Sequence, residues 1–361
     1  MPTNETGQPT ADPARQRTGG AGKGPAVAAL GAGLAVLGAA GALSLPILTH
    51  GLAGTPKGAG QVSSRETRPL SAHRIARRHL VAPRHQRRIL AVGAESQYAN
   101  VISQIGGPYV HVVSFLKNPN TDPHVFEAST QDARLVAAAG LAVQNGLGYD
   151  SFMNRLEAAS PNPHRIVITA AQVMHAPSDL RNPHLFYQPG EMARVAARIA
   201  SALERLEPAH TAYFAARVRL FDRSLVPWQR AIAELRKAYR GAPVAVTEPV
   251  ADDLLEAAGL SVRTPWSFQA AVMNSTDPSP QDVAIAENLI LHHSVRVLVY
   301  NRQAVDSITT LLLGLARSHH IPVIGVYETL PPGLNYQTWM LDETIAIERA
   351  LRDHLSSFTL R

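Results

Sequence analysis

The 361-residue sequence contains no cysteine. This absence excludes disulfide bridges, thiolate zinc sites, cysteine nucleophiles and attachment of a lipid through an N-terminal cysteine. Aromatic residues make up 6% of the chain and charged residues 17%, whereas 45% of the residues are hydrophobic. These proportions are typical of a chain that buries enough apolar surface to fold. Any bound metal ion must therefore be held by nitrogen and oxygen atoms.

Charge is missing altogether from residues 25–48, PAVAALGAGLAVLGAAGALSLPIL, which follow a polar, basic N-region at residues 1–24. A cleaved signal has an apolar centre of about 7 to 15 residues and a spanning helix needs about 20, so the length favours a retained membrane anchor. The many alanines and glycines, with small-residue sites around Ala42 and Ala53, favour cleavage. The interpretations as export signal and as anchor both stay open.

Residues 49–88 are predicted to form a basic, flexible linker. Its arginines account for much of the chain's net charge of +6. The segment lacks aromatic residues interleaved for base stacking, so nucleic acid is not expected as a partner. Attraction to anionic lipid or to a wall polymer fits this composition. Positive charge on the outer side of an anchor conflicts with the positive-inside rule, and that conflict stays open.

Short apolar runs alternate with helical patterns from Ile89 to the C-terminus. This alternation predicts an α/β fold with two lobes, residues 89–207 and 241–361, each built on a mostly parallel sheet. Residues 190–239 are almost continuously helical in pattern. Pro208 fits the first turn of a second helix in this region, so a connecting helix is predicted over residues 208–240. Such a helix is about 45 to 50 Å long, enough to run the length of both lobes.

Four of the predicted strands end next to residues that can bind a metal ion. The strand YVHVVSFL leads to His124, RIVIT leads to His184, APVAVTE ends at Glu248 and IPVIGVYE ends at Glu328. Ligand sites in open α/β sheets collect where parallel strands finish, so these side chains are candidates for one metal site. A proline precedes each histidine and restricts its backbone. Asp122 is placed to accept the proton on the far ring nitrogen of His124.

Each of these four residues also has a simpler interpretation. A lone loop histidine is more often a surface residue than a ligand, and the chain has 15 histidines. The two glutamates are followed by turn residues and can be solvated loop acids. A third Pro-His pair shows that this dipeptide alone does not identify a ligand. Its histidine, His164, stands before the strand RIVIT, at the end opposite to the other candidate ligands. His164 is therefore predicted to lie on the surface.

The motifs between Ile89 and Leu355 resemble those of the metal-specific substrate-binding proteins of ABC importers, which deliver zinc, manganese or iron(II). The similarity rests on several separated motifs in the family's order, among them DPHVFEAS, NPHLFYQPGEM, VAVTEPVADDLLEAAGL and IPVIGVYETLPPG followed by YQTWM. The resemblance implies two α/β lobes, each with a mostly parallel four-stranded sheet and flanking helices. It also implies one long rigid helix that joins the lobes and a metal in the cleft between them.

Residue by residue, the resemblance places the family's four ligands at His124, His184, Glu248 and Glu328. The chain departs from the family at Asn182, where the second motif usually opens with aspartate, and at the fourth ligand, which is commonly aspartate. Two histidines and two carboxylates accept manganese or iron(II) as readily as zinc, although raw affinity favours zinc. The transported ligand is therefore predicted to be zinc or manganese, with iron(II) also compatible.

These observations together predict an extracytoplasmic substrate-binding protein, not an enzyme. It is expected to act as a monomer at the outer face of the cell membrane and to deliver metal to an ABC permease and its ATPase. A metal-dependent hydrolase is one alternative, but the chain has no HExxH, no GxSxG and no glycine-rich phosphate loop. A surface adhesin on the same fold is another. A binder of organic ligands is a third, with Trp266, Phe268 and Trp339 as stacking residues.

Overall fold

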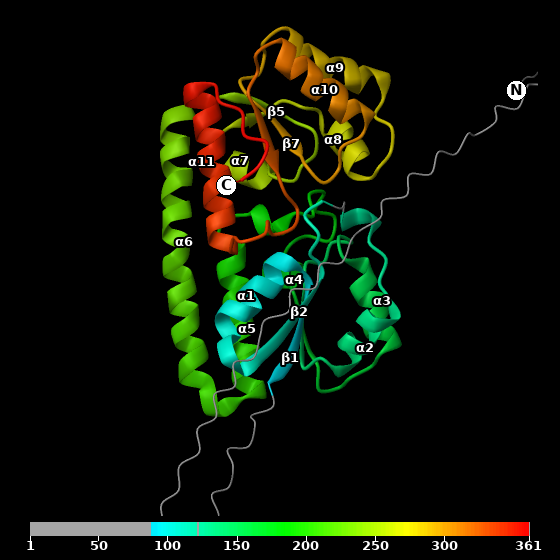
Figure 1. Cartoon of the computed structure of the whole chain (residues 1–361), viewed down its shortest axis with the longest axis vertical. Coiled ribbons are helices and arrows are strands. Elements are labelled where there is room, and N and C mark those ends of the chain that lie inside the picture. The colour runs from blue at the N-terminus through cyan, green and yellow to red at the C-terminus, as the bar shows by residue number, and fades with distance from the viewer. Residues whose placement is uncertain (1–87, 121–122, 361) are drawn as a thin grey trace, which may run out of the picture. The chain divides into compact units, whose positions relative to one another are not determined.

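The computed structural model describes residues 88–120 and 123–360, with two separate parallel sheets (Figure 1). All of these residues belong to one compact unit. The predicted N-region, the signal or anchor and, except for Arg88, the basic linker lie outside the described residues. Within the described part of the chain, none of the helices combines the length and the apolar character needed to cross a membrane.

The first sheet has the strand order β2-β1-β3-β4, and all of its strands run parallel. Helices connect the strands, because a parallel pair needs a crossover connection. The elements of this lobe, in which η denotes a short 3-10 helix, are β1 (Ile89–Glu95), α1 (Ser96–Gly106), η1 (Gly107–Tyr109), β2 (Val110–Leu116), η2 (Pro123–Val125), α2 (Thr130–Ala138), β3 (Leu141–Gln144), α3 (Ser151–Ala159), β4 (Ile166–Thr169), α4 (Ala170–Val173), η3 (Leu185–Tyr187) and α5 (Glu191–Leu206).

The second sheet has the strand order β6-β5-β7-β8 and is also parallel. Its elements are β5 (Pro243–Val246), α7 (Asp252–Ala257), β6 (Ser261–Val262), α8 (Trp266–Met273), α9 (Pro280–Leu291), β7 (Leu298–Asn301), α10 (Ser307–Ser318), β8 (Val323–Val326) and α11 (Tyr336–Asp353). The predicted α/β class with two four-stranded parallel sheets is thus confirmed. The sequence pattern did not predict strand β6, because two residues are too few to show a period.

The C-terminal tail covers the outer edge of β8. The Ser357 N–H donates to the Val323 carbonyl at 2.9 Å, and the Gly325 N–H donates to the Ser357 carbonyl at 2.8 Å. An open strand edge otherwise presents unpaired backbone groups to other chains. The tail therefore protects the edge of the second sheet.

Two apolar cores lie on opposite faces of the second sheet. Successive side chains of a strand point to opposite faces, so β5 contributes Val244 and Val246 to one core and Ala245 to the other. The first core continues through α11, the long helix α6 and the first lobe. Because this core crosses the boundaries expected near residues 207 and 240, the division into domains stays a prediction.

Helix α6 (Thr211–Tyr239) is the long helix between the lobes and contains 29 residues, which gives a length of about 44 Å. Pro208, expected in the first turn of this helix, lies in the short 3-10 helix η4 (Pro208–His210) immediately before it. The helix packs against α1 and α5 of the first lobe and against α11 of the second (Figure 1). Trp228 of α6 donates a hydrogen bond from its indole N–H to Thr344 Oγ1 at 3.0 Å. Helix α6 thus contacts helices of both lobes.

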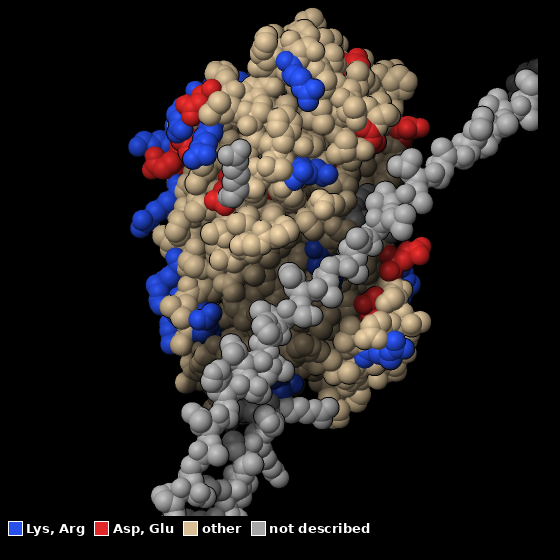
Figure 2. Space-filling model, in the orientation of Figure 1, with Lys and Arg blue, Asp and Glu red and all other residues tan. Residues whose placement is uncertain are grey.

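Helices α6 and α11 carry many of the charged side chains that are visible in Figure 2. On the face drawn in Figure 2, Lys and Arg gather along the edge formed by α6 and α11, with Asp and Glu among them. On α11, exposed Arg352 pairs with Glu348 at 2.7 Å and with Asp353 at 2.8 Å. Exposed pairs of this kind contribute little to stability. The edge carries interleaved charges of both signs.

Candidate metal site

Three of the four predicted ligands come together at the carboxyl ends of the parallel strands. His124 lies in η2 after β2, His184 directly precedes η3, and Glu328 follows β8. One potential ligand atom of each side chain lies within 4.8 Å of the other two, and no other such group of three occurs among the described residues. Glu328 Oε2 is 3.1 Å from His184 Nε2 and 3.4 Å from His124 Nε2. Donor atoms from both lobes therefore face a common point.

The three side chains differ in their exposure to solvent. His184 and Glu328 are completely buried, whereas the His124 side chain is 21% exposed. A buried charged group is stable only when it is paired or coordinates a metal. The His124 Nε2 atom is itself buried, so the partial exposure of this side chain belongs to other atoms of the residue.

Asn182 orients the imidazole of His184. Its side-chain oxygen lies 2.8 Å from His184 Nδ1 and also accepts a hydrogen bond from the His184 backbone N–H at 3.2 Å. When Nδ1 donates its proton to Asn182, Nε2 is the nitrogen that faces Glu328. A metal ion that binds Nε2 takes the place of a proton on that atom. Asn182 thus fills the orienting role that a second-shell partner has at metal-bound histidines.

The carboxylate of Glu328 is held in its ionised form. Burial by itself raises the pKa of this group, but hydrogen bonds and charge interactions from His124 and His184 lower the pKa below its ordinary value. Tyr149, in the loop after β3, donates from its hydroxyl group to Glu328 Oε2 at 2.9 Å. Gln97 donates to the Glu328 backbone carbonyl at 3.2 Å. The site therefore offers a negative oxygen whose position is fixed on several sides.

Glu248, the remaining predicted ligand, is buried but does not belong to the group of three described above. Both of its carboxylate oxygens lie 3.3 Å from the side-chain nitrogen of Asn301. The same nitrogen donates to Glu328 Oε1 at 2.5 Å. The structure thus links Glu248 to Glu328 through an amide group. Its role as a metal ligand stays a prediction.

The suggested partner of His124, Asp122, lies outside the described residues. His164 is exposed, and its backbone N–H donates to Asn162 Oδ1 at 3.0 Å in the loop before β4. His164 is not a member of the three-residue group. The chain thus contains two Asn-Pro-His segments, of which one turns its imidazole into the site and the other lies at the surface.

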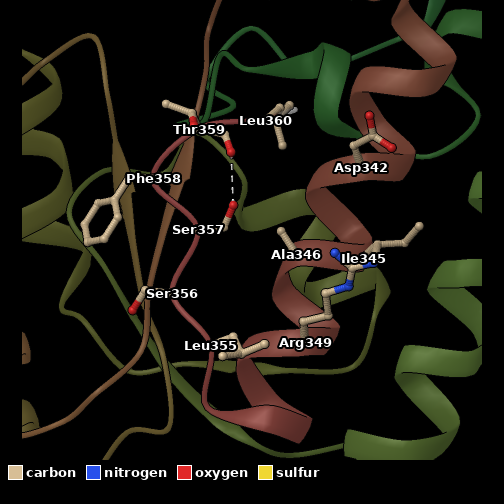
Figure 3. A pocket seen from close by; sticks show the side chains of 10 residues that line it. All are labelled: Asp342, Ile345, Ala346, Arg349, Leu355, Ser356, Ser357, Phe358, Thr359 and Leu360. Carbon is tan, nitrogen blue, oxygen red and sulfur yellow. Dashed lines mark hydrogen bonds between the residues drawn. The ribbon is translucent and has the colours of Figure 1, made fainter.

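A surface hollow of about 560 Å³ lies between α11 and the C-terminal tail (Figure 3). Asp342 and Arg349 line it from the helix, and Ser357 and Thr359 line it from the tail. The residues that line this hollow include none of the four predicted ligands. Asp342 therefore does not replace Glu328 at the three-residue group.

The aromatic residues considered for stacking on an organic ligand have other roles. Phe268 and Trp339 are completely buried in the two cores. The Trp339 indole N–H donates to Glu343 at 2.7 Å. Trp266 lies beneath the guanidinium group of Arg181, 4.9 Å from its ring centre. These three side chains serve packing and a cation–π contact rather than a ligand cleft.

The sequence interpretation missed Tyr149 and Asn301, which both donate to the carboxylate of Glu328. Asn301 is the last residue of β7, directly after the predicted strand VRVLVY, so the rule used for the four ligands applied to it as well. An amide is a weaker metal ligand than an imidazole or a carboxylate, so ligand chemistry alone does not single out Asn301. No sequence signal marked Tyr149.

Comparison with known proteins agrees with this geometry. The family model described as zinc-uptake complex component A, periplasmic, matches residues 92–350, which is more than half of the chain. No curated protein sequence matches the chain significantly.

Several solved structures share the fold. The periplasmic zinc binding protein TroA from Treponema pallidum has a TM-score of 0.63 at 15% identity, with 74% of this chain and 100% of that chain covered. The SBP FpvC from Pseudomonas aeruginosa, in complex with Mn2+, has a TM-score of 0.62 at 20% identity, with coverage of 74% and 99%. A Mn-bound periplasmic metal binding protein from Candidatus Liberibacter asiaticus has a TM-score of 0.59 at 17% identity, with coverage of 73% and 100%.

The order of the motifs, the pair of parallel sheets and the match over residues 92–350 agree with one another. The chain belongs to the family of periplasmic metal-binding substrate-binding proteins described as zinc-uptake complex component A.

Proposed function

We propose that this chain is the extracytoplasmic substrate-binding component of an ABC importer and that its cargo is one divalent transition metal ion. His124, His184 and Glu328 are the proposed ligands in the observed arrangement, and Glu248 is the proposed fourth ligand. The observation that supports this most strongly is the convergence of three donor atoms within 4.8 Å from both lobes. The complete burial of the Glu328 carboxylate supports it further, because a buried charge must be paired or must coordinate a metal.

Zinc or manganese is the proposed cargo. The similar structures from Treponema pallidum and Pseudomonas aeruginosa are described as zinc binding and as a complex with Mn2+, respectively. Imidazole nitrogen suits zinc, and carboxylate oxygen suits manganese, so a mixed donor set is compatible with either ion. Magnesium and calcium prefer sites made of oxygen alone and are not expected to compete.

The proposed route of the ion runs from the outside of the cell to a membrane permease and its ATPase. Export of the chain by residues 25–48, as a cleaved signal or as a retained anchor, belongs to the same proposal. In this role the protein captures and releases the ion without chemical change. The ligands on the two lobes, His124 and His184 on one and Glu328 on the other, make binding and release dependent on the contact between the lobes.

Native mass spectrometry of the whole chain, purified without added metal and then titrated with zinc or manganese, tests the binding step. One ion per chain is expected for the wild type. His124→Ala and His184→Ala should each abolish tight binding, because each removes one of three converging donors. His164→Ala is the matched control, since it also removes an imidazole that follows a proline. Equal weakening by all three substitutions, or no binding by the wild type, contradicts the proposal.

Metal uptake tests the importer role separately. Cells that lack this chain are supplied with either the wild-type chain or His184→Ala, and accumulation of zinc and manganese from a metal-poor medium is measured. The wild type should restore uptake and the variant should not. Restoration by both proteins would show that transport does not pass through this site.

A further inference from the structure

The strand order of the second sheet places Asn301 between the two carboxylates of the site. Glu248 follows β5 and Glu328 follows β8, and β7 lies between these two strands in the sheet. Asn301 is the last residue of β7 and pairs in register with Val326, the last residue of β8. The side chain of Asn301 therefore leaves the sheet at the same edge as both glutamates.

The side-chain nitrogen of Asn301 bridges the two carboxylates. It donates to Glu328 Oε1 at 2.5 Å and lies 3.3 Å from each oxygen of Glu248. All three side chains are buried, with exposures of 1% for Asn301, 3% for Glu248 and 0% for Glu328. Two carboxylates in a buried region repel each other unless a donor or a cation lies between them. The amide group supplies that donor.

Neighbouring groups fix the orientation of this amide. The backbone N–H of Gln303 donates to Asn301 Oδ1 at 2.9 Å, so the NH₂ group must point to the carboxylates. The backbone N–H of Asn301 donates to Thr247 Oγ1 at 3.2 Å, which ties the end of β7 to the residue before Glu248. Rotation of the amide would break the bond from Gln303 and place an oxygen against two negative groups. The bridge is therefore rigid.

The two oxygens of Glu328 consequently have different surroundings. Oε1 is bound by Asn301, whereas Oε2 faces His124, His184 and the hydroxyl group of Tyr149. An ion at the point shared by the two imidazoles meets a single oxygen of this carboxylate. A bidentate contact with Glu328 would require the carboxylate to turn Oε1 toward the ion and away from the amide of Asn301.

We infer that Asn301 is a positioning residue that sets the metal preference of this site toward zinc. It restricts Glu328 to one coordinating oxygen and holds Glu248 on the same amide, so that few carboxylate oxygens reach the ion. Zinc is bound in four-coordinate sites, whereas manganese suits octahedral sites rich in oxygen. This inference rests on the proposed function, because it assigns the selectivity of the same site.

Asn301→Ala and Asn301→Leu test the inference in the whole chain. Both variants lack the donor, and Asn301→Leu also keeps nearly the size of the side chain. Gln269→Ala is the matched control, because Gln269 is an equally buried amide of the same lobe that donates to the Thr264 carbonyl at 3.0 Å. Dissociation constants for zinc and manganese are measured by competition with a chelating indicator.

The ratio of the manganese to the zinc dissociation constant should fall about tenfold or more in both Asn301 variants, the change expected when one hydrogen bond to a charged group is lost. It should stay unchanged in Gln269→Ala. Unchanged ratios in the Asn301 variants, with metal still bound, overturn the inference and leave the proposed function intact. Absence of binding by the wild type overturns both.

A spectrum of the wild-type chain loaded with Co²⁺ can refute the inference even if both Asn301 variants fail to fold. Four-coordinate cobalt absorbs visible light far more strongly than six-coordinate cobalt, because a tetrahedral site has no centre of inversion. We expect the intense, four-coordinate type of spectrum. A weak, six-coordinate spectrum of the wild type would refute the restriction to few oxygens without any substitution.

Discussion

Replacing Asn182 with alanine is expected to weaken metal binding about 10- to 100-fold, although Asn182 is not itself a proposed ligand. Its side-chain oxygen lies 2.8 Å from His184 Nδ1. That contact selects the tautomer of His184 and directs Nε2 to the point where the other donor atoms meet. Without it, the imidazole can carry its proton on either nitrogen and can rotate about its bond to Cβ.

The size of the effect follows from the number of contacts that are lost. Alanine removes one acceptor from a fully buried imidazole and leaves the backbone of His184 in place. Loss of such an outer partner at a metal-bound histidine costs about 10- to 100-fold in affinity, which corresponds to about 1.4 to 2.8 kcal/mol. Loss of His184 itself removes a donor atom and should cost more.

Asn162→Ala provides a control of the same local structure. Asn162 also opens an Asn-Pro-His segment and accepts the backbone N–H of the histidine, at 3.0 Å compared with 3.2 Å for Asn182. Its histidine, His164, is exposed and lies outside the three-residue group. Competition titrations of zinc and manganese with both variants should therefore show a loss for Asn182→Ala alone.

Wild-type affinity in Asn182→Ala, together with loss of binding in His184→Ala, would refute this role of Asn182. That result would mean that the packing around His184 orients its ring without the hydrogen bond. Equal losses for Asn182→Ala and Asn162→Ala would instead point to a general effect on the fold.

Other perturbations give further expected results. Glu328→Gln, which loses the charge, and Glu328→Asp, which loses reach, should both lower metal affinity in the same titrations, whereas Glu348→Gln, at a partly exposed residue of α11, should not; retained affinity in both Glu328 variants would exclude this residue as a ligand. A metal ion bound only by the folded state should raise the melting temperature, with about 4 kcal/mol of added stability at about a thousandfold excess over the dissociation constant. An equal shift with calcium would argue against two histidine ligands. Burial raises the pKa of Glu191 from 4.5 to about 8, so the folded state retains a proton that the unfolded state releases. Stability measured by urea unfolding should therefore fall as the pH rises from about 4.5 to about 8, and Glu191→Gln should flatten part of that fall; an unchanged pH profile in the variant would contradict the raised pKa.

Glu343 is unsuitable as a control carboxylate in the metal-affinity tests, because its side chain is buried. Glu343 is buried and accepts hydrogen bonds from Tyr187 at 2.6 Å and from Trp339 at 2.7 Å. Tyr187 belongs to the first lobe and Glu343 to α11 of the second. A substitution at Glu343 is therefore expected to destabilise the contact between the lobes.

The local sequence pattern determined the elements and the edge at which the site lies. Alternation of apolar runs with helical segments predicted the strands, because parallel strands need crossover helices. Parallel strands finish at a common edge, so His124, His184 and Glu328 could be selected because each lies in the segment that follows a predicted strand. The same rule placed His164 at the other end of β4, where it is exposed. These inferences use only the direction of the chain and the period of its side chains.

The tertiary structure alone decided which of these residues meet and which groups support them. The order β6-β5-β7-β8 places β7 between the strands that carry Glu248 and Glu328, and this order brings the amide of Asn301 between their carboxylates. Contact between the lobes brings Tyr149 to Glu328, residues that are far apart in the sequence. Side-chain periodicity reports which face of an element is buried, but it carries no information about the element packed against that face. The contacts that hold and tune the site therefore follow from the three-dimensional arrangement of the lobes.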